Sequence, residues 1–409
     1  MRSMKCSFAA GVCALALLSW TPARGLTLEE ALVRAARTRF EVAAIPGEVR
    51  AGEGDLLQAA ARPAPEVDLE TRNALEETSV GMSLVHERGG KRDARVARAR
   101  ANLDLLVAHG EVRRLDVGLQ VRKAYFAVLA AEQSFALAEE SRKVTRSFAE
   151  TVDEKVRAGA ASPIEATRAA VRLHGAAAGI ERARREVALA RAELALAVGD
   201  PGVRSEALEG RLPEDTTVPD PVALAAQIAG SQDLKLLERE VLVRRSVLAE
   251  EQAQSKRDIT WRAAANYSRL DEEAWVTVGI TIPLFAPGRN RGALAAATAD
   301  MERAESERTA AERRLTAELE RAPAGLHASA REAAVLRNNV LTGAEQAHAT
   351  VQEGYRLGKF PYLDVLDASE VLLAARLQYT GALAALAQAR IDVDRLLGRT
   401  GLPSTTNDR

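Results

Sequence analysis

The spacing of hydrophobic residues divides the chain into long helical stretches and four short segments with a different period. Apolar residues recur at helical intervals over 91–157 and 289–358, and both stretches contain few glycines or prolines. At 1.5 Å per residue, each would form a helix about 100 Å long. Residues 163–199 and 361–398 follow with the same period. We therefore predict two antiparallel helical hairpins in a mainly α-helical protein.

The four short segments alternate apolar and polar residues with a period of two, which is typical of β-strands. They form two pairs, one at about 65–86 and the other at about 258–285. Each segment is about 9 to 12 residues long, and a tilted membrane-spanning strand needs roughly 9–11 residues. A soluble hairpin with one buried face would show the same alternation. The apolar positions of the last segment, which we predict to be membrane-facing, are Val276, Val278, Ile280, Ile282 and Leu284.

Aromatic residues favour the membrane interpretation of these segments. The chain is only 4% aromatic, yet Trp261, Tyr267, Trp275 and Phe285 lie close together, as in the aromatic girdles of membrane proteins. We therefore expect the alternating apolar side chains to contact outer-membrane lipid. Four strands cannot close a barrel, whereas three chains would supply twelve. The membrane interpretation thus requires a homotrimer.

The order of the elements repeats along the chain with a shift of 199 residues. RAGAASPIEA aligns with RLGKFPYLDV at this shift, and ERGGKRDA aligns with APGRNRGA at the same shift. This agreement predicts an internal duplication, in which each repeat contains a helix, two strands and a long helical hairpin. The predicted units are a first repeat at 26–199 with its tip near 158–163, a linker at 200–221, a second repeat at 222–398 with its tip near 357–362, and a C-terminal tail at 399–409.

Residues 1–25 have the features of a signal peptide, with basic residues, an apolar run and small residues at Ala23 and Gly25. We therefore expect export from the cytoplasm. Cys6 and Cys13 both lie in this segment, so the mature chain would have no disulfide and no thiolate metal site. Val12 precedes Cys13 where a lipid anchor requires a small residue, so we expect no lipidation.

Charge and side-chain chemistry exclude several other functions. The 56 basic and 57 acidic residues give a net charge of −1, which does not favour nucleic acid as a partner. The five histidines are scattered without ligand spacing, so we predict no metal site and no cofactor. The GGKR and GRNRG stretches lack a Walker or dinucleotide-binding pattern. No nucleophile has an identifiable base, so we predict that the protein is not an enzyme.

Several motifs together resemble those of the TolC-type outer membrane efflux family, in particular its branch for heavy-metal cation efflux of the RND class. They are the signal peptide, the opening TLEEAL, GGKR and PLFAPGRNRGA after the paired strands, and YRLGKFPYLDVLDASEVLLAAR. The resemblance implies a homotrimer in the outer membrane of a Gram-negative bacterium. Its strands would form one 12-stranded β-barrel, and its long helices would form a periplasmic α-helical barrel, or tunnel.

The resemblance also implies two protein partners, a periplasmic adaptor and an inner-membrane RND pump. The adaptor would dock at the hairpin tips, which contain Gly159 and Gly358. Outer-membrane channels for drug efflux or type I protein secretion would share this fold. A soluble periplasmic coiled-coil scaffold would explain the helices but not the paired alternating segments.

The acidic residues Asp364 and Asp367 allow two interpretations. Acidic side chains near the start of a helix interact favourably with free N–H groups and with the helix dipole, which would explain either residue. The family resemblance instead implies a periplasmic gate, because the family's entrance is ringed by aspartates in a matching DVLDA motif. In a trimer each aspartate would occur three times around a narrow opening and would favour cations.

The resemblance further implies a latch that holds the gate shut. In the TolC prototype, a tyrosine and an arginine on one hairpin bind an acid on the other. The tyrosine matches Tyr355 and the acid matches Glu165, whereas Phe360 stands at the position of the arginine. Arg356 or Lys359 could replace that arginine.

Overall fold

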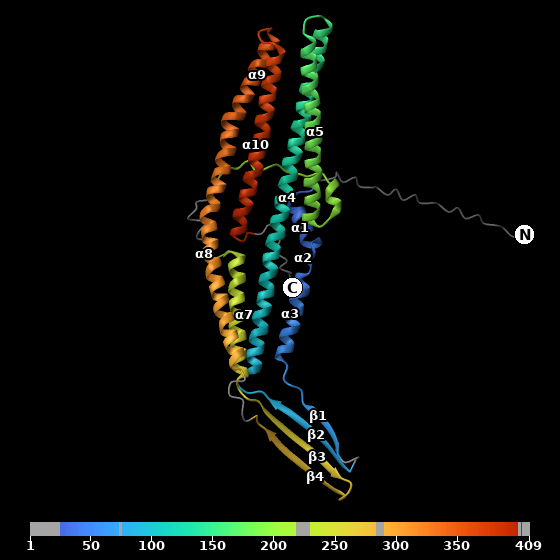
Figure 1. The fold of residues 1–409 in the computed structure, drawn as a ribbon, viewed down its shortest axis with the longest axis vertical. Helices are drawn as coiled ribbons and strands as arrows, with labels where there is room; N and C mark the ends of the chain where they lie inside the picture. The colour runs from blue at the N-terminus through green and yellow to red at the C-terminus, as the bar shows by residue number, and fades with distance from the viewer. Residues whose placement is uncertain (1–24, 73–75, 218–229, 284–289, 400–401, 403–409) are drawn as a thin grey trace, which may run out of the picture.

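The computed structural model describes residues 25–72, 76–217, 230–283, 290–399 and 402. Over these residues the molecule is long and narrow, with two hairpin tips at one end and a four-stranded sheet at the other (Figure 1). No helix within these ranges has an apolar stretch that is long enough to cross a bilayer. Several predicted features lie wholly or partly outside the described residues: the signal peptide up to residue 24, residues 218–221 of the linker, Leu284, Phe285 and most of the C-terminal tail.

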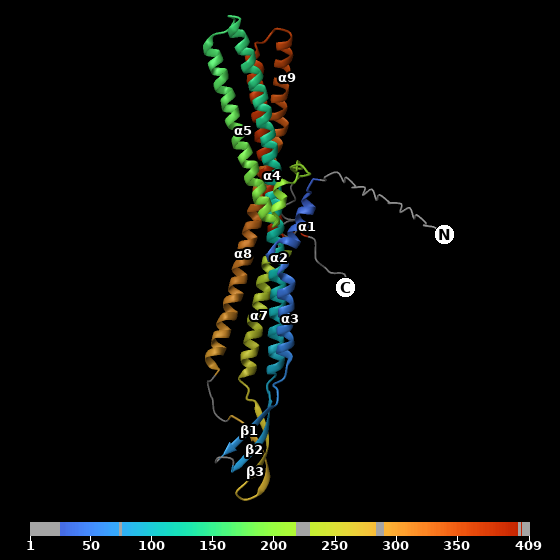
Figure 2. The same cartoon turned by 90° about the vertical axis from the view of Figure 1, so that its right-hand side faces the viewer.

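The first half of the chain places short helices beside one very long helix and its returning partner (Figures 1 and 2). Its first helix begins with a capping box: Thr27 Oγ1 accepts the Glu30 N–H at 3.2 Å, and the Glu30 carboxylate accepts the Thr27 N–H at 3.1 Å. The helices are α1 (Leu28–Thr38), α2 (Phe40–Ala43), α3 (Ile45–Ala60), α4 (Lys91–Arg157), α5 (Pro163–Val198) and the 3-10 helix η2 (Pro201–Ser205).

The second half has the same order of a helix, two strands, a long helix and a returning helix. Its helices are α7 (Gln232–Gln254), α8 (Arg291–Val335), the π-helix η4 (Leu336–Leu341), α9 (Thr342–Arg356) and α10 (Tyr362–Leu396). The predicted helix over 289–358 is therefore interrupted by one π-helical turn. In this wider turn the Thr342 hydroxyl donates to the carbonyl of Arg337, five residues earlier, at 3.1 Å. The long helix α4 of the first half contains no such turn.

The four strands form one antiparallel sheet in the order β1-β2-β3-β4. The strands are β1 (Glu66–Arg72), β2 (Glu77–His86), β3 (Ile259–Ser268) and β4 (Glu273–Thr281). The central pairing joins the two halves of the chain, with Met82 of β2 opposite Ala263 of β3. Both predicted strand pairs are thus present. Ile282 lies one residue beyond the end of β4, and its side chain is exposed.

The main hydrophobic core lies in the middle of the helical body, where α1, α4, α5, α8 and α10 contribute buried side chains. Tyr125 of α4 is only 1% exposed, and its hydroxyl lies 2.9 Å from the carbonyl oxygen of Leu26 and 2.6 Å from that of Glu209. Burial raises the pKa of this hydroxyl, so it remains a neutral donor. The contact holds two chain segments, around residues 26 and 209, against the long helix.

Candidate functional site: a two-faced sheet and two hairpin tips

The register of the sheet separates apolar from polar side chains almost completely. One row across the sheet runs through Val67, Met82, Ala263 and Val278, which lie opposite one another on neighbouring strands. Because side chains alternate along a strand, these four residues share one face. The same face carries Leu69, Val80, Leu84, Trp261, Ala265, Val276 and Ile280.

This apolar face has no cover within the described residues. Val67 is 74% exposed and Val278 is 73% exposed, although buried positions are usual for such side chains. Trp261 lies near the helix-side end of the face and Tyr267 near the opposite end, so an aromatic residue marks each end. Contiguous exposed apolar surface of this kind marks a contact with lipid or protein.

The opposite face of the sheet is polar. Arg262 forms an ion pair with Asp68 across β2, and Gly81 lies between them. A Cβ atom at Gly81 would lie 2.6 Å from Asp68 Oδ2, so a larger residue there would displace this carboxylate from its present position. Thr277 Oγ1 accepts a hydrogen bond from Asn266 Nδ2 at 2.9 Å on the same face.

Trp275 belongs to the polar face, because it lies opposite Asn266 and alternates with Val276. The interpretation of Trp275 as part of a lipid-facing girdle is therefore wrong. Clustering of aromatic residues in the sequence does not reveal which face each one occupies; only the strand register does.

The two hairpin tips have the same backbone geometry. Gly159 and Gly358 both have φ = +72°, a left-handed conformation that strains other residues. In the first tip the Ala160 N–H donates to the Lys155 carbonyl at 2.8 Å, and in the second the Lys359 N–H makes the matching bond at 2.8 Å. A Cβ atom at either glycine would meet no atom within 4 Å. The glycines thus end α4 and α9 while leaving the tip surfaces open.

Aromatic side chains connect the second tip to the first hairpin. The Tyr362 ring stacks on Phe148 of α4, with ring centroids 5.8 Å apart, and lies 5.2 Å from the Tyr355 ring. The Tyr362 hydroxyl lies 3.3 Å from Ser147 Oγ. Phe360 packs against its own hairpin, since a Cβ atom at Gly354 would lie 2.0 Å from the Phe360 ring.

The structure brings only some of the predicted gate residues together. Tyr355 contacts Tyr362, but its hydroxyl has no hydrogen-bond partner among the described residues. Glu165 and Asp364 each occupy the third position of their helix, α5 and α10, and within the described chain neither carboxylate has an ion-pair partner. Arg356 pairs with Glu353 of its own helix at 3.3 Å. Within one chain, therefore, the predicted latch is not assembled.

Arg172 of α5 contacts one of the predicted gate residues, and the sequence did not reveal it. Its guanidinium lies 3.4 Å from Asp367 Oδ1 and 3.7 Å from Glu370 Oε1, both on α10. The ion pair connects the two hairpins of one chain next to a small core of Phe148, Ala169 and Leu366. Arg172 lies seven residues after Glu165 and on the same side of α5, which the sequence shows. The sequence does not show that this side of α5 lies near α10, so it could not predict the ion pair with Asp367.

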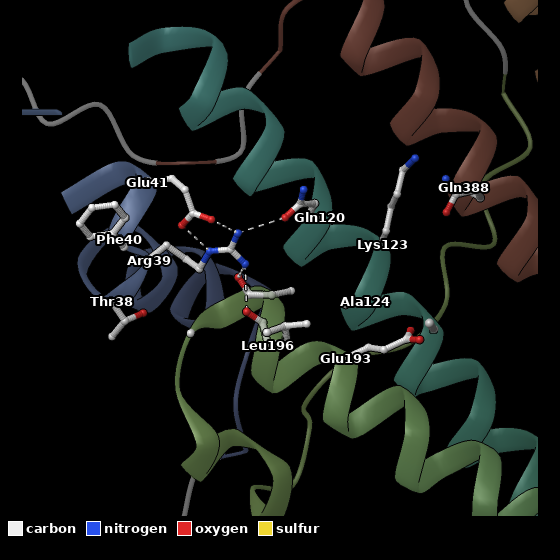
Figure 3. A pocket seen from close by; sticks show the side chains of 13 residues that line it. Thr38, Arg39, Phe40, Glu41, Gln120, Lys123, Ala124, Glu193, Leu196 and Gln388 are labelled. Atoms are coloured by element: carbon white, nitrogen blue, oxygen red, sulfur yellow. Dashed lines mark hydrogen bonds and ion pairs between the residues drawn. The ribbon is translucent and has the colours of Figure 1, made fainter. Parts of the chain in front are cut away.

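A surface hollow of about 740 Å³ lies near the middle of the helical body (Figure 3). In its wall Arg39 donates to the carbonyls of Leu196 (2.9 Å) and Ala197 (3.3 Å) at the end of α5, and to Glu41 (2.8 and 3.0 Å). The hydrogen bond from Arg39 lowers the pKa of Glu41. These polar groups already have partners, whereas Phe40 at the rim is 79% exposed. The hollow therefore resembles a protein contact surface more than a ligand pocket.

Within the described ranges, no three His, Cys, Asp or Glu side chains are placed to hold a metal ion. The candidate functional surfaces are the two faces of the sheet and the hairpin tips. They lie at opposite ends of the long helical body (Figure 1). This arrangement suits a protein that connects two separate environments.

Solved structures with this fold include an outer-membrane channel and another outer-membrane protein. The chain aligns with the CmeC outer membrane channel of Campylobacter jejuni with a TM-score of 0.75, over 98% of this chain and 94% of that chain, at 13% identity. It aligns with the outer membrane protein VceC of Vibrio cholerae with a TM-score of 0.70, over 91% of this chain and 96% of that chain, at 17% identity. At these identities the likeness establishes the fold alone.

Sequence similarity establishes the family. The model of the family described as "Outer membrane efflux protein" matches residues 31–200 and 228–399. The cobalt-zinc-cadmium resistance protein CzcC of Cupriavidus metallidurans (strain ATCC 43123 / DSM 2839 / NBRC 102507 / CH34) is 32% identical over 377 residues, which cover 91% of this chain and 90% of CzcC. The chain therefore belongs to the outer membrane efflux protein family. The predicted family, efflux function and outer-membrane location are confirmed.

Proposed function

We propose that this protein is the outer-membrane exit duct of a tripartite system that exports heavy-metal cations. We propose heavy-metal cations as the substrate class because this chain is similar to a cobalt-zinc-cadmium resistance protein over nine-tenths of both chains. A periplasmic adaptor and an inner-membrane RND pump would supply the cation to the duct. The metal is cargo in this proposal, so the chain itself needs no resident metal site.

The membrane-spanning part is a barrel made by three chains. The exposed apolar face of the sheet supports lipid contact, and its polar face supports a water-filled interior. One chain provides four strands, so three chains give a closed 12-stranded barrel without free edges. The exposed Phe40 beside the hollow at Arg39 is a candidate contact between chains of the trimer.

The two halves of the chain are products of an internal duplication. The same family model matches one segment in each half, and both halves have the same order of elements. The equal φ of Gly159 and Gly358 at equivalent positions supports the same conclusion. The trimer would then present two hairpin tips from each chain at the periplasmic entrance.

The periplasmic gate is built from the acids of α10, with different roles for the two aspartates. Asp367 pairs with Arg172 and connects the two hairpins of its own chain. Asp364 has no ion-pair partner among the described residues, so its charge is free to act on ions at the entrance. Tyr355 and Glu165 contribute to the gate through contacts with neighbouring chains of the trimer.

Growth on metals tests the proposed function directly. In a strain that lacks its outer-membrane metal channel, expression of this chain with its cognate adaptor and pump should restore tolerance to cobalt, zinc or cadmium. A variant that does not assemble in the membrane serves as the negative control. Restored tolerance to drugs without any change for metals would contradict the proposed substrate class.

Bulky residues at the hairpin tips should uncouple the duct from its adaptor. The positions of Gly159 and Gly358 are open, so Gly159→Val or Gly358→Val adds surface bulk and a local strain of roughly 1–2 kcal/mol without an internal clash. We expect normal amounts of assembled protein in the outer membrane but a loss of adaptor cross-linking and of metal tolerance.

The substitutions Gly159→Asn and Gly358→Asn separate strain from bulk, because asparagine tolerates a left-handed conformation better than valine. If the tips are docking surfaces, asparagine should also weaken the cross-link. Disappearance of the assembled protein in the valine variants, with full rescue by asparagine, would show that the glycines serve folding instead.

A further inference from the structure

A surface hollow of about 940 Å³ lies where the sheet adjoins the helices α7 and α8 (Figure 1). Three strand residues that line it form one row across the sheet, with Val85 opposite Thr260 and Thr260 opposite Thr281. Val85 follows Leu84 and Thr281 follows Ile280, and both of these preceding residues belong to the apolar face. Because side chains alternate along a strand, the row belongs to the polar face. The hollow therefore lies on the polar side of the sheet.

The charged side chains of this hollow have a net charge of +3. Four basic residues and one acidic residue line it: Lys91, Lys256, Arg257, Arg291 and Asp258. Lys91 and Asp258 pair at 2.7 Å, so their charges cancel. Within the ranges that the structure describes, the other three bases have no carboxylate partner, and all three are exposed. We call Lys256, Arg257 and Arg291 the junction collar.

Local structure accounts for only part of this positive charge. Lys256 and Arg257 follow the end of α7, where a positive charge suits the helix dipole. The Lys256 side chain also packs against Gly89, since a Cβ atom there would lie 2.3 Å from Lys256 Cγ. Arg291 instead occupies the first position of α8, where a positive charge opposes the dipole. Three like charges around one hollow also repel one another, so the collar costs stability unless it acts on ions.

We propose that the junction collar lies inside the duct and concentrates small inorganic anions where the β-barrel meets the helical tunnel. The proposal rests on the proposed function, in which the polar face of the sheet lines a water-filled interior. Three bases from each of three chains would place nine positive charges around one level of the duct. A ring of like charge in a narrow channel attracts ions of the opposite sign. The collar would thus admit anions that accompany the exported cations.

Cysteine labelling at two neighbouring positions of β4 can test the collar. Cys6 and Cys13 are the only cysteines of the chain and lie in the predicted signal peptide, so one introduced cysteine is the only thiol of the mature protein. Thr281→Cys places this thiol in the hollow, and Ile280→Cys places it on the apolar face as the matched control. The full-length assembled protein in planar bilayers is treated with an anionic or a cationic methanethiosulfonate reagent. The rate of the change in pore current is divided by the rate of the same reagent with a small thiol in solution.

At Thr281→Cys we expect these normalised rates to favour the anionic reagent by about tenfold at low salt, because the collar attracts it. The preference should fall towards one as potassium chloride rises to about 1 M, since salt screens the field; this measurement needs no change in the collar. Arg257→Gln with Arg291→Gln should also bring the ratio close to one, whereas Arg257→Lys with Arg291→Lys should preserve it. Ile280→Cys should give no change in current with either reagent.

The reversal potential in a potassium chloride gradient gives a second measurement. Arg257→Gln with Arg291→Gln should raise the permeability of cations relative to anions by about twofold. The matched control is Arg62→Gln with Arg88→Gln. These exposed bases belong to the same connecting region, but the structure does not place them among the residues that line the hollow. Their loss should leave the permeability ratio unchanged.

The results that would overturn the proposal differ in what they contradict. Equal normalised rates for both reagents at Thr281→Cys would show that the collar creates no positive potential, while leaving the duct and its efflux function intact. An equal rise in cation permeability in the Arg62 and Arg88 variant would show that the hollow has no special role. A change in current at Ile280→Cys with none at Thr281→Cys would show that the polar face does not line the pore, which contradicts the proposed membrane role of the sheet itself.

Discussion

An arginine at Val278 should prevent the protein from assembling in the outer membrane. Val278 lies on the apolar face, between the row of Trp261 near the helix-side end and the row of Tyr267 near the other. A positive charge that faces lipid near the middle of the bilayer costs about 2–4 kcal/mol, and a trimer would bear this cost three times. We expect little assembled protein in outer-membrane fractions, measured as heat-sensitive oligomer on gels.

Thr277 provides the matched control, because it is the next residue on the same strand but lies on the polar face. Thr277→Arg should leave most of the assembly intact. Ile280→Arg should be less damaging than Val278→Arg, since Ile280 lies opposite Trp261, nearer the edge of the apolar face. Equal tolerance of arginine at positions 277 and 278 would show that the two faces of the sheet do not contact lipid and water as proposed.

Replacing Asp364 and Asp367 together with asparagine should remove the cation preference of the periplasmic entrance. Asparagine has nearly the same volume as aspartate but no charge, so the field at the opening would be lost while the hairpins keep their shape. In planar bilayers we expect normal assembly and a reduction of about tenfold or more in block by polyvalent cations from the periplasmic side. Cation preference should fall in the same measurement.

Single substitutions can test the different roles of the two aspartates. Asp364→Asn should account for most of the loss of block, because Asp367 is already paired with Arg172 at 3.4 Å. Arg172→Gln should instead strengthen the block, since it leaves Asp367 and Glu370 without their cation. Unchanged selectivity and block in the double asparagine variant would support helix capping, because asparagine caps a helix nearly as well as aspartate.

The elements of this fold follow from local patterns in the sequence. Period-two alternation predicted four strands, and each observed strand lies within a few residues of its predicted position. The sequence predicted hairpin tips that contain Gly159 and Gly358, and both glycines occur in turns there, at φ = +72°. Such features depend on residues close together in the chain, so periodicity and turn chemistry are sufficient to predict them.

Two predictions from the sequence pattern were wrong. One concerned the continuity of a long helix, and the other concerned the face of the sheet on which an aromatic residue lies. The π-helical turn at Leu336–Leu341 interrupts a stretch whose apolar spacing predicted one continuous helix. Trp275 lies on the polar face, although its neighbours in sequence suggested a lipid-facing girdle. One residue of register moves a strand side chain to the other face, so composition alone could not place it.

By itself the sequence determined the long helical hairpins, the strand pairs with one apolar side, the glycine-containing tips and the family. Only the tertiary structure paired Arg172 with Asp367, stacked Tyr362 on Phe148 and brought Lys256 against Gly89. The first set depends on the period of helices and strands and on backbone conformation, which neighbouring residues encode. The second set joins residues that are 160 or more positions apart. Their contacts depend on which faces of distant helices meet, and no local pattern specifies that packing.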